Sequence, residues 1–337
     1  MTTSTSSWVG RLLRPYLGAV ACAAVLAGCA SGTIPTAEPR AADAPLQVVA
    51  SVAPITDIVR RVAGDQVTLT GAIPEGVDSH TFRPQQDLAA LISEADVIFL
   101  NGLSLEKPVM ELADIIGVPS DRVVRLGDAV VPASDYRYDF SFPQSGGKPN
   151  PHAWMSPLLG RAYARVVADE LCRRAADDCA LFRANLRAFE EQVDRLDTAM
   201  RTAFATIPGA KRLLTYHDAY AYFAAEYGWE VVGAVQPADF GRPSPAEVDG
   251  LVRQIRDTGV SVLFGSEMFP SSVVQQLAHA SGARYVTDLS DDDLPGEPGD
   301  ADNTYLAMLV DNYATITEQL GGDAAALRSV PVGAVRS

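Results

Sequence analysis

Histidine and cysteine are both scarce in this chain of 337 residues, which contains four of each. Basic residues are outnumbered, with 27 Lys and Arg against 42 Asp and Glu, so the net charge is −15. An acidic body argues against nucleic-acid binding, which needs a basic stripe. The sequence also has no Gly-rich phosphate loop, no HExxH motif and no serine nucleophile elbow. It therefore lacks the signatures of several common enzyme classes.

A long apolar run is also missing, because the run near the N-terminus is short. Arg11 and Arg14 precede LGAVACAAVLAG, which falls short of the roughly 20 residues that a spanning helix needs. The run closes on Leu-Ala-Gly-Cys29, which resembles a bacterial lipobox. We interpret residues 1–28 as a signal peptide and Cys29 as the lipidated residue that anchors the protein to the outer face of the cell membrane. The alternative is an ordinary secretory signal with an incidental cysteine.

The residues after the anchor divide into a tether and two larger parts. Residues 29–45 are small, polar and Pro-rich, which is typical of a flexible tether. About 290 residues remain, more than one core usually accommodates, so two domains are expected. The predicted boundaries are an N-terminal lobe at 46–175, a linker helix at 176–208 and a C-terminal lobe at 209–325.

Strand-like and helix-like patterns alternate in both halves of the chain. Strands are expected at 46–52, 67–73, 96–102, 122–128, 211–217, 230–236, 260–266 and 284–289. Amphipathic helices are expected at 55–64, 84–95, 106–117, 219–228, 244–259, 271–282 and 303–322. This alternation predicts an α/β fold in which each lobe has a mainly parallel sheet covered by helices.

One long helical pattern separates the two halves. Residues 177–207 contain neither Gly nor Pro. Their apolar residues form one stripe at helical spacing. Its members are Leu181, Phe182, Leu186, Phe189, Val193 and Leu196. At 1.5 Å per residue this helix would run for about 40 Å and join the lobes as a rigid rod.

Two cysteines remain once the leader and the anchor are set aside. Cys172 and Cys179 would lie about 10 Å apart on one unbroken helix, too far for a disulfide. The sequence RRAADD between them offers a helix break, with Asp177 or Asp178 as a cap. We predict a disulfide across that corner, since an exported protein keeps disulfides. Two free buried thiols are the alternative.

Three of the four histidines stand where a strand pattern gives way to a loop. They are His80 in VDSHTFRP, His152 in NPHAWMSP and His217 in LLTYHDAY, and Asp288 ends the strand-like RYVTDL. Imidazole and carboxylate are ligands of borderline-soft divalent ions, and four of them can close a tetrahedron. Because ligands bind beyond the carboxyl ends of parallel strands, we predict a metal site at the lobe interface.

Other residues near these positions have more ordinary explanations. His279 lies mid-pattern in VVQQLAHASG, which indicates a solvated helix face. The run 291–293 consists of three aspartates, for which a solvated acidic loop is the plainer interpretation. Glu267 ends the neighbouring strand and is a candidate for a carboxylate that orients a ligating imidazole from behind.

Taken together, the segments DSHTFRP, NPHAWMSP, TYHDAYAYFAAEYG and TDL resemble the substrate-binding proteins of zinc and manganese ABC transporters. The resemblance covers roughly residues 46–322. It implies two α/β lobes joined by a rigid helix, with one metal ion held in the cleft by His80, His152, His217 and Asp288. Manganese-selective members commonly carry glutamate at the third position, so His217 resembles the zinc-binding branch.

The resemblance implies capture of a divalent ion outside the cytoplasm and delivery to a cognate ABC permease, without catalysis. Zinc is the expected ion and manganese the alternative, since Mn²⁺ prefers more oxygen ligands. The protein is expected to be a monomer, with a metallochaperone as a further candidate partner. The loop 131–149 lacks the histidines that many zinc-binding members have there, and we expect it to be exposed. Segment 236–245 departs from the family pattern and has no assigned role.

Two other functions fit part of the pattern. A surface adhesin could hold an incidental metal, and a secreted zinc hydrolase would also use three histidines. For the hydrolase, a fourth ligand would take the position of the reacting water, and Glu267 is the one evident base candidate.

Overall fold

The structure, a computed structural model, describes residues 44–268 and 271–333. The chain divides into two units, and the described residues other than Ala44 belong to the second, Pro45–Ser337. The predicted signal peptide, Cys29 and most of the tether therefore lie outside the described residues. Within the described part, no helix has both the length and the apolar character needed to cross a bilayer.

The first sheet of the second unit is parallel, with strand order β2-β1-β3-β4. Its strands are β1 (Leu46–Ala50), β2 (Val67–Gly71), β3 (Val97–Leu100) and β4 (Val123–Arg125). The helices that accompany it are α1 (Ala53–Ala63), α2 (Gln86–Glu94), α3 (Lys107–Ile115) and α4 (Leu126–Val130). Successive side chains of β3 alternate between two cores: Phe99 joins one and Ile98 the other. Helices on both faces explain why the strand is apolar throughout.

The second sheet is also parallel and has the order β6-β5-β7-β8. Its strands are β5 (Arg212–Thr215), β6 (Glu230–Ala234), β7 (Val262–Ser266) and β8 (Arg284–Leu289). The helices of this half are α7 (Ala221–Tyr227), α8 (Pro245–Thr258), α9 (Ser271–Ser281), α10 (Tyr305–Gln319) and α11 (Ala325–Arg328). The predicted α/β fold with two parallel sheets is confirmed. The domain boundaries assigned to the lobes stay predictions.

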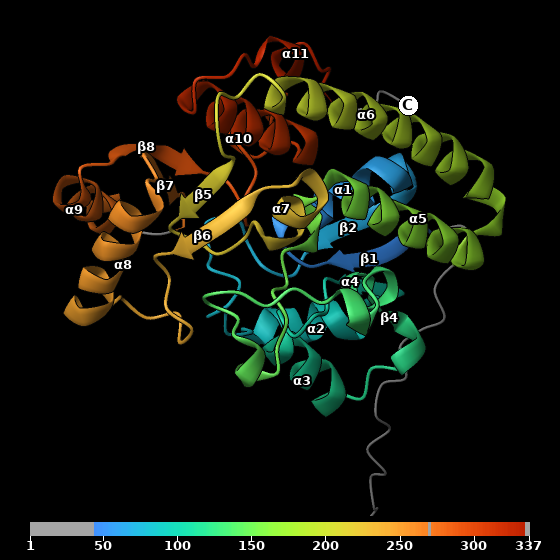
Figure 1. Cartoon of the computed structure of the whole chain (residues 1–337). Helices are drawn as coiled ribbons and strands as arrows, with labels where there is room; N and C mark the ends of the chain where they lie inside the picture. The colour runs from blue at the N-terminus through green and yellow to red at the C-terminus, as the bar shows by residue number, and fades with distance from the viewer. Residues whose placement is uncertain (1–43, 269–270, 334–337) are drawn as a thin grey trace, which may run out of the picture. The chain divides into compact units, whose positions relative to one another are not determined.

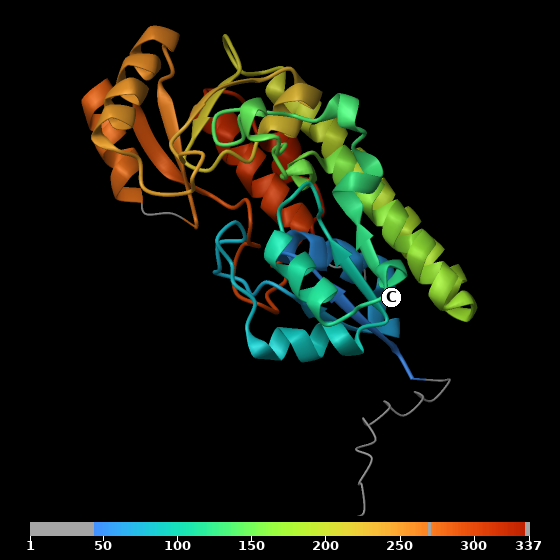
Figure 2. The same cartoon turned by 90° about the horizontal axis from the view of Figure 1, so that it is seen from below.

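Two long helices, α5 (Pro157–Arg174) and α6 (Cys179–Phe204), occupy the middle of the chain. With 26 residues, α6 rises about 39 Å and packs against α5 and α1 as well as α10 and α11 (Figures 1 and 2). Five members of the predicted apolar stripe are buried, and Leu181 is half-buried. A disulfide joins Cys172 to Cys179 across the corner between α5 and α6, where their Cα atoms are 4.5 Å apart.

The two sheets share one hydrophobic core. Ala50 and Phe99 of the first sheet belong to the same buried cluster as Leu213 and Phe264 of the second. A wide separation of the lobes would expose this apolar surface to water, which is unfavourable. The packing therefore favours small displacements of the loops between the lobes over a large opening.

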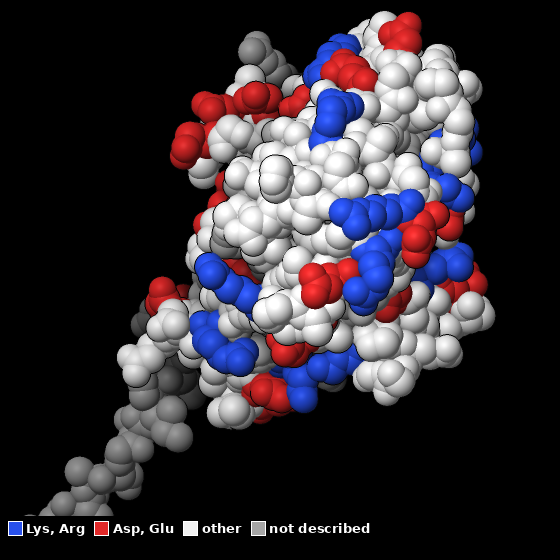
Figure 3. Space-filling view, turned by 60° about the vertical axis from the view of Figure 1, so that its left-hand side comes forward, with Lys and Arg blue, Asp and Glu red and all other residues white. Residues whose placement is uncertain are grey.

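Charged side chains of both signs are intermingled on the face shown in Figure 3, with uncharged surface between them. This face has no continuous basic stripe.

Candidate metal centre

Loops from the carboxyl ends of both sheets meet at one point. His80 follows β2, His217 follows β5 and Asp292 follows β8, while His152 precedes the short turn Ala153–Met155 before α5. In each sheet the order in which the parallel strands are added reverses at the centre, between β1 and β3 in the first sheet and between β5 and β7 in the second. This is where open parallel sheets place their ligands.

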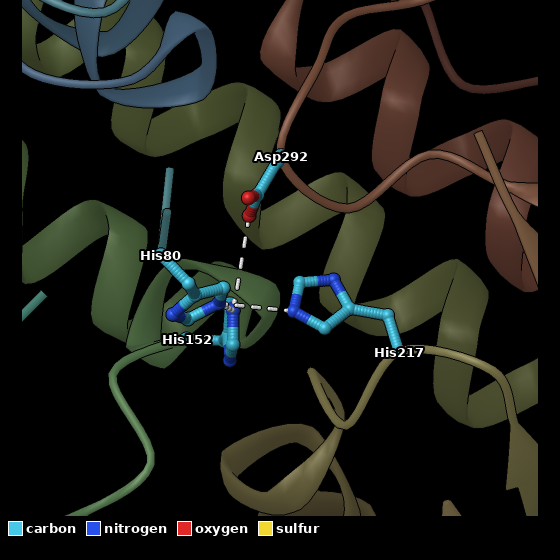
Figure 4. Close-up of side chains that lie close together, drawn as sticks. All are labelled: His80, His152, His217 and Asp292. Atoms are coloured by element: carbon cyan, nitrogen blue, oxygen red, sulfur yellow. Dashed lines mark hydrogen bonds and ion pairs between the residues drawn. The ribbon is translucent and has the colours of Figure 1, made fainter. Parts of the chain in front are cut away.

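Three imidazole nitrogens and one carboxylate converge there (Figure 4). The Nε2 atom of His80 lies 3.1 Å from Nε2 of His152 and 3.1 Å from Nε2 of His217. The Asp292 Oδ1 atom lies 3.7 Å from Nε2 of His152. Ligand atoms around tetrahedral zinc, with Zn–N bonds of about 2.0–2.1 Å, are separated by about 3.4 Å. The observed spacing matches a set of atoms that share one small cation.

A fixed amide sets the tautomer of His152. The Nδ2 group of Asn150 donates to the Asp139 carboxylate and to the Asp218 carbonyl, so its Oδ1 is left to accept. That oxygen lies 2.8 Å from Nδ1 of His152, which must carry the proton. The Nε2 lone pair of His152 therefore points toward the other two imidazoles. The ring is fully buried, and burial places its pKa well below the ordinary value.

Two carboxyl groups lie behind this amide. Burial, together with the charge of Asp218, raises the pKa of Asp139 to about 9. Burial also raises the pKa of Asp218, whose Oδ2 accepts a hydrogen bond from the Ser141 backbone N–H. At neutral pH the two groups hold a proton between them, because two adjacent buried charges are unfavourable. The network that holds the Asn150 amide therefore carries one negative charge instead of two.

His217 has a carboxylate behind it. Its Nδ1 lies 2.7 Å from Oδ1 of Asp291, and both side chains are buried. Burial alone would lower the pKa of His217, but the charge of Asp291 and this hydrogen bond outweigh it, with help from Asp292 and Glu267. The result is a pKa of about 10. Without a bound cation, His217 is the imidazole of the site that carries a positive charge at neutral pH.

The loop that carries Asp291 and Asp292 is held by its backbone. Glu267 Oε1 accepts hydrogen bonds from the N–H groups of Asp291, Asp292 and Asp293, at 2.8, 3.1 and 3.1 Å. The indole of Trp154 donates to the Asp291 carbonyl. These contacts turn the loop so that two aspartate side chains face inward. Their exposed fractions are 1% for Asp291 and 3% for Asp292.

One oxygen of Asp292 is engaged and the other is not. Oδ2 accepts a hydrogen bond of 2.6 Å from the Ser79 hydroxyl. Oδ1 is buried and has no hydrogen-bond partner among the described residues. A buried carboxylate oxygen without a partner is unfavourable unless a cation binds it. The free oxygen faces the three Nε2 atoms, which is where a metal ion would be held.

His80 is the half-buried member of the group, and aromatic rings position it. Its ring is stacked on Phe240, with centroids 4.7 Å apart and planes within 8°, and lies 5.6 Å from Phe142. Asp78 accepts a hydrogen bond from its backbone N–H. Burial of the ring lowers the pKa of His80 to about 3, so the imidazole is neutral and free to bind a cation.

The loop 131–149 is only partly exposed, contrary to expectation. Ser141 and Phe142 are buried, because the Ser141 hydroxyl donates to the Gln236 carbonyl and Phe142 packs beside His80 and Phe240. Segment 236–245, to which the sequence assigned no role, supplies the ring that stacks on His80. The two loops contribute aromatic walls to the site instead of extra ligands.

The structure brings together the three predicted histidines and a different carboxylate. Asp288 pairs with Gly265 in the β7–β8 ladder, and its side chain lies outside the described part, so its role as ligand stays a prediction. The solvated-loop interpretation is wrong for Asp291 and Asp292, which are buried because Glu267 turns their loop inward. Glu267 itself contacts the backbone of this loop, and Asp291 is the carboxylate behind an imidazole. His279 is exposed on α9.

The comparisons with known proteins agree with this geometry. The family model described as zinc-uptake complex component A, periplasmic (ZnuA), matches residues 48–319. The chain belongs to this family. It is 28% identical to the zinc-binding protein TroA of Treponema pallidum over 285 residues, covering 83% of this chain and 90% of TroA. The solved structure of periplasmic TroA superposes with a TM-score of 0.74 at 26% identity, covering 82% of this chain and 99% of that one.

Other relatives in the ZnuA family are named for different metals. The manganese ABC transporter substrate-binding lipoprotein PsaA of Streptococcus pneumoniae (strain TIGR4) is 28% identical over 321 residues, covering 93% of this chain and 98% of PsaA. The iron-binding protein YfeA of Yersinia pestis is 26% identical over 317 residues, covering 93% of this chain and 99% of YfeA. This ZnuA-family chain is accordingly an extracytoplasmic metal-binding component of an ABC transporter and not an enzyme. Membership of the family leaves the choice of metal open.

Proposed function

We propose that this protein captures zinc outside the cytoplasm and delivers it to a cognate ABC permease. The ligands in this proposal are Nε2 of His80, His152 and His217 and Oδ1 of Asp292. The observation that carries it is the free, buried Asp292 Oδ1 beside three imidazole nitrogens. Asp288 is the alternative for the fourth ligand, as the sequence suggested.

Zinc is preferred over manganese in this proposal because of the number and type of ligand atoms. Three nitrogens and one oxygen complete a tetrahedron, which Zn²⁺ accepts without electronic cost. Mn²⁺ favours more oxygen atoms and higher coordination. The Ser79 hydroxyl occupies the second oxygen of Asp292, which opposes the bidentate binding that would raise the coordination number. Four ligands also leave no position for a reacting water.

Anchoring and release complete the proposed function. Cys29 would carry the lipid that keeps the protein at the outer face of the membrane, near the permease. The ligands come from loops of both sheets, and Ser79 and Gly76 of the first lobe are hydrogen-bonded to Asp292 and Asp293 of the second. Breaking these two contacts would withdraw the carboxylate by a small loop movement. The shared core could stay intact during such a release.

The choice of metal is tested by elemental analysis of the purified protein and by direct competition. We expect one zinc ion per chain and a preference for Zn²⁺ over Mn²⁺ of at least about a hundredfold, since nitrogen-rich sites follow the Irving–Williams order. Manganese is the second candidate because PsaA is named for it. Equal or tighter binding of Mn²⁺ would overturn the zinc proposal and favour manganese capture.

Zinc binding is expected to release about one proton per ion at neutral pH. His217, with its pKa of about 10, must lose its proton to bind the metal, whereas His80, with a pKa of about 3, is already neutral. As the pH falls, protons compete more strongly for His217. The apparent affinity should therefore decrease about tenfold per pH unit from about pH 9 down to about pH 5.

Titration calorimetry in buffers of different ionisation enthalpy measures the released proton, and chelator competition at several pH values measures the slope. An affinity that is flat between pH 7 and pH 9 would show that His217 is neutral before zinc binds, or is not a ligand. If His217 had the ordinary histidine pKa of about 6.5, the zinc affinity would instead fall only in acid.

A further inference from the structure

A cavity of about 360 Å³ adjoins the metal centre on the side of His80. Its walls come from both lobes, and include His80, Leu103, Phe142, Phe240 and the proline pair Pro149 and Pro151. The stacked ring of His80 forms part of the wall, while Nε2 of the same ring belongs to the proposed ligand set. The cavity therefore lies directly beside one ligand of the proposed zinc site.

Backbone strain is concentrated around this cavity. Among the described residues, Leu103, Ser104 and Phe240 are the non-glycine residues with positive φ, at 50°, 69° and 59°. All three line the cavity. Such conformations are unfavourable and persist where the surrounding structure fixes them, commonly at binding sites. Here Leu103 is fixed by burial and by a hydrogen bond from its N–H to Asp128, and Phe240 by its stack on His80.

The charge around the cavity is opposite to that of the whole chain. Arg83, Lys107 and Lys148 line it, and none of the described aspartates or glutamates does, although the net charge of the chain is −15. Lys107 lies 3.6 Å from Glu111, and both are exposed. In residues 44–268 and 271–333, neither Arg83 nor Lys148 forms an ion pair. Two cavity-lining cations that form no ion pair among the described residues, in an otherwise acidic protein, favour an anionic ligand.

The remaining walls narrow the class of anion. Leu103, Phe142 and Phe240 are apolar, and Ser104 offers an exposed hydroxyl. Apolar walls with a few polar and charged groups, in a volume of several hundred Å³, are typical of sites for small organic ligands. A small organic polycarboxylate combines carboxylates for the cations with a carbon skeleton for the apolar walls.

We propose that this cavity binds a small polycarboxylate, from whose zinc complex the ion passes to His80. This inference rests on the proposed zinc function. The polycarboxylate would dock as an anionic chelate through Arg83 and Lys148, with Lys107 at the rim. Zinc would then exchange the carboxylate oxygens of the chelator for the imidazole nitrogens of the protein, the proton displaced from His217 would pass to solvent, and the free polycarboxylate anion would leave the cavity. No proton or electron transfer to the chelator is required.

Capture of zinc from its citrate complex tests the proposal, with the whole protein and with its R83E K148E variant. Binding is followed by the fluorescence of Trp154, whose ring centroid lies 5.0 Å from that of His152. We expect the variant to take zinc from zinc citrate at least about tenfold more slowly, because the complex is negatively charged. From a non-chelating buffer it should take zinc as fast as the wild type or faster, because the added acids attract Zn²⁺.

The matched control is R187E R253E, which makes the same change of charge at two exposed arginines that do not line the cavity. This control should capture zinc from citrate at the wild-type rate within about threefold, since distant surface charges are screened. Circular dichroism checks that each variant is folded, and R83Q K148Q gives a milder pair for the same comparison.

Several results would overturn the inference. One is an equal slowing of the cavity variant and the control variant, which would indicate general electrostatics. Another is a wild-type rate that does not depend on the concentration of zinc citrate, since capture would then follow free zinc alone. Normal zinc binding in non-chelating buffer with either result would leave the proposed zinc function standing. Failure of the wild type to bind zinc at all would contradict both this inference and the proposed zinc function.

Discussion

His217→Ala is expected to lower the zinc affinity by about a thousandfold or more while the protein still folds. The substitution removes one of four ligands, and even the loss of a residue that only orients a ligand costs about 10–100-fold. It also removes the group that balances Asp291, whose Oδ1 would keep only the Ser266 hydroxyl, at 3.3 Å. A lower melting temperature is therefore expected as well, because an acid is left without its buried partner. The shared core of the two sheets does not include this imidazole.

The measurement is a competitive titration with a chelating dye, with circular dichroism to confirm folding. His279→Ala is the matched control, because it removes the same side chain from an exposed position on α9. It should leave zinc affinity within about twofold of the wild type, as surface substitutions usually do little. An unchanged affinity in His217→Ala would show that this residue is not a ligand.

The sequence predicted the framework of the site well, because the framework depends on local patterns. All eight expected strands are present, and His80 and His217 follow the rule that ligands lie beyond the carboxyl ends of parallel strands, whereas His152 lies in the loop between α4 and α5. The long helix was also visible, since a 26-residue amphipathic helix repeats its apolar stripe many times. Local periodicity and chain order were enough to bring His80, His152 and His217 to one place.

The loops were harder to predict, because contacts between distant residues shape them. Asp292 is turned inward by Glu267, which is 25 residues away in the chain. Phe240 reaches His80 only through a left-handed backbone conformation that an aromatic residue rarely adopts. Neither contact leaves a periodic signal. A run of three aspartates directly after a strand was the one hint, and it was equally compatible with a solvated loop.

The fourth ligand is decided by three matched substitutions, Asp288→Asn, Asp291→Asn and Asp292→Asn. Each removes one negative charge from a stretch of five residues, so their long-range electrostatic effects are nearly equal. We expect Asp292→Asn to weaken zinc binding by about a thousandfold, because an amide oxygen is a much poorer ligand for the ion than a carboxylate. The hydrogen bond from Ser79 can be kept by the amide oxygen, which limits the effect on folding.

Asp291→Asn should weaken zinc binding less than Asp292→Asn does, and it should also change the number of protons released. Without the carboxylate behind its Nδ1, His217 loses the interaction that raises its pKa, so zinc binding should release less than one proton. Its affinity should fall by about 10–100-fold, as for other residues that orient a ligating imidazole. Asp288→Asn should leave both affinity and proton release near wild type. If Asp288→Asn instead gives the largest loss of zinc affinity, Asp288 at the end of β8 is the fourth ligand. Asp292 would then hold its loop beside the site without binding the ion.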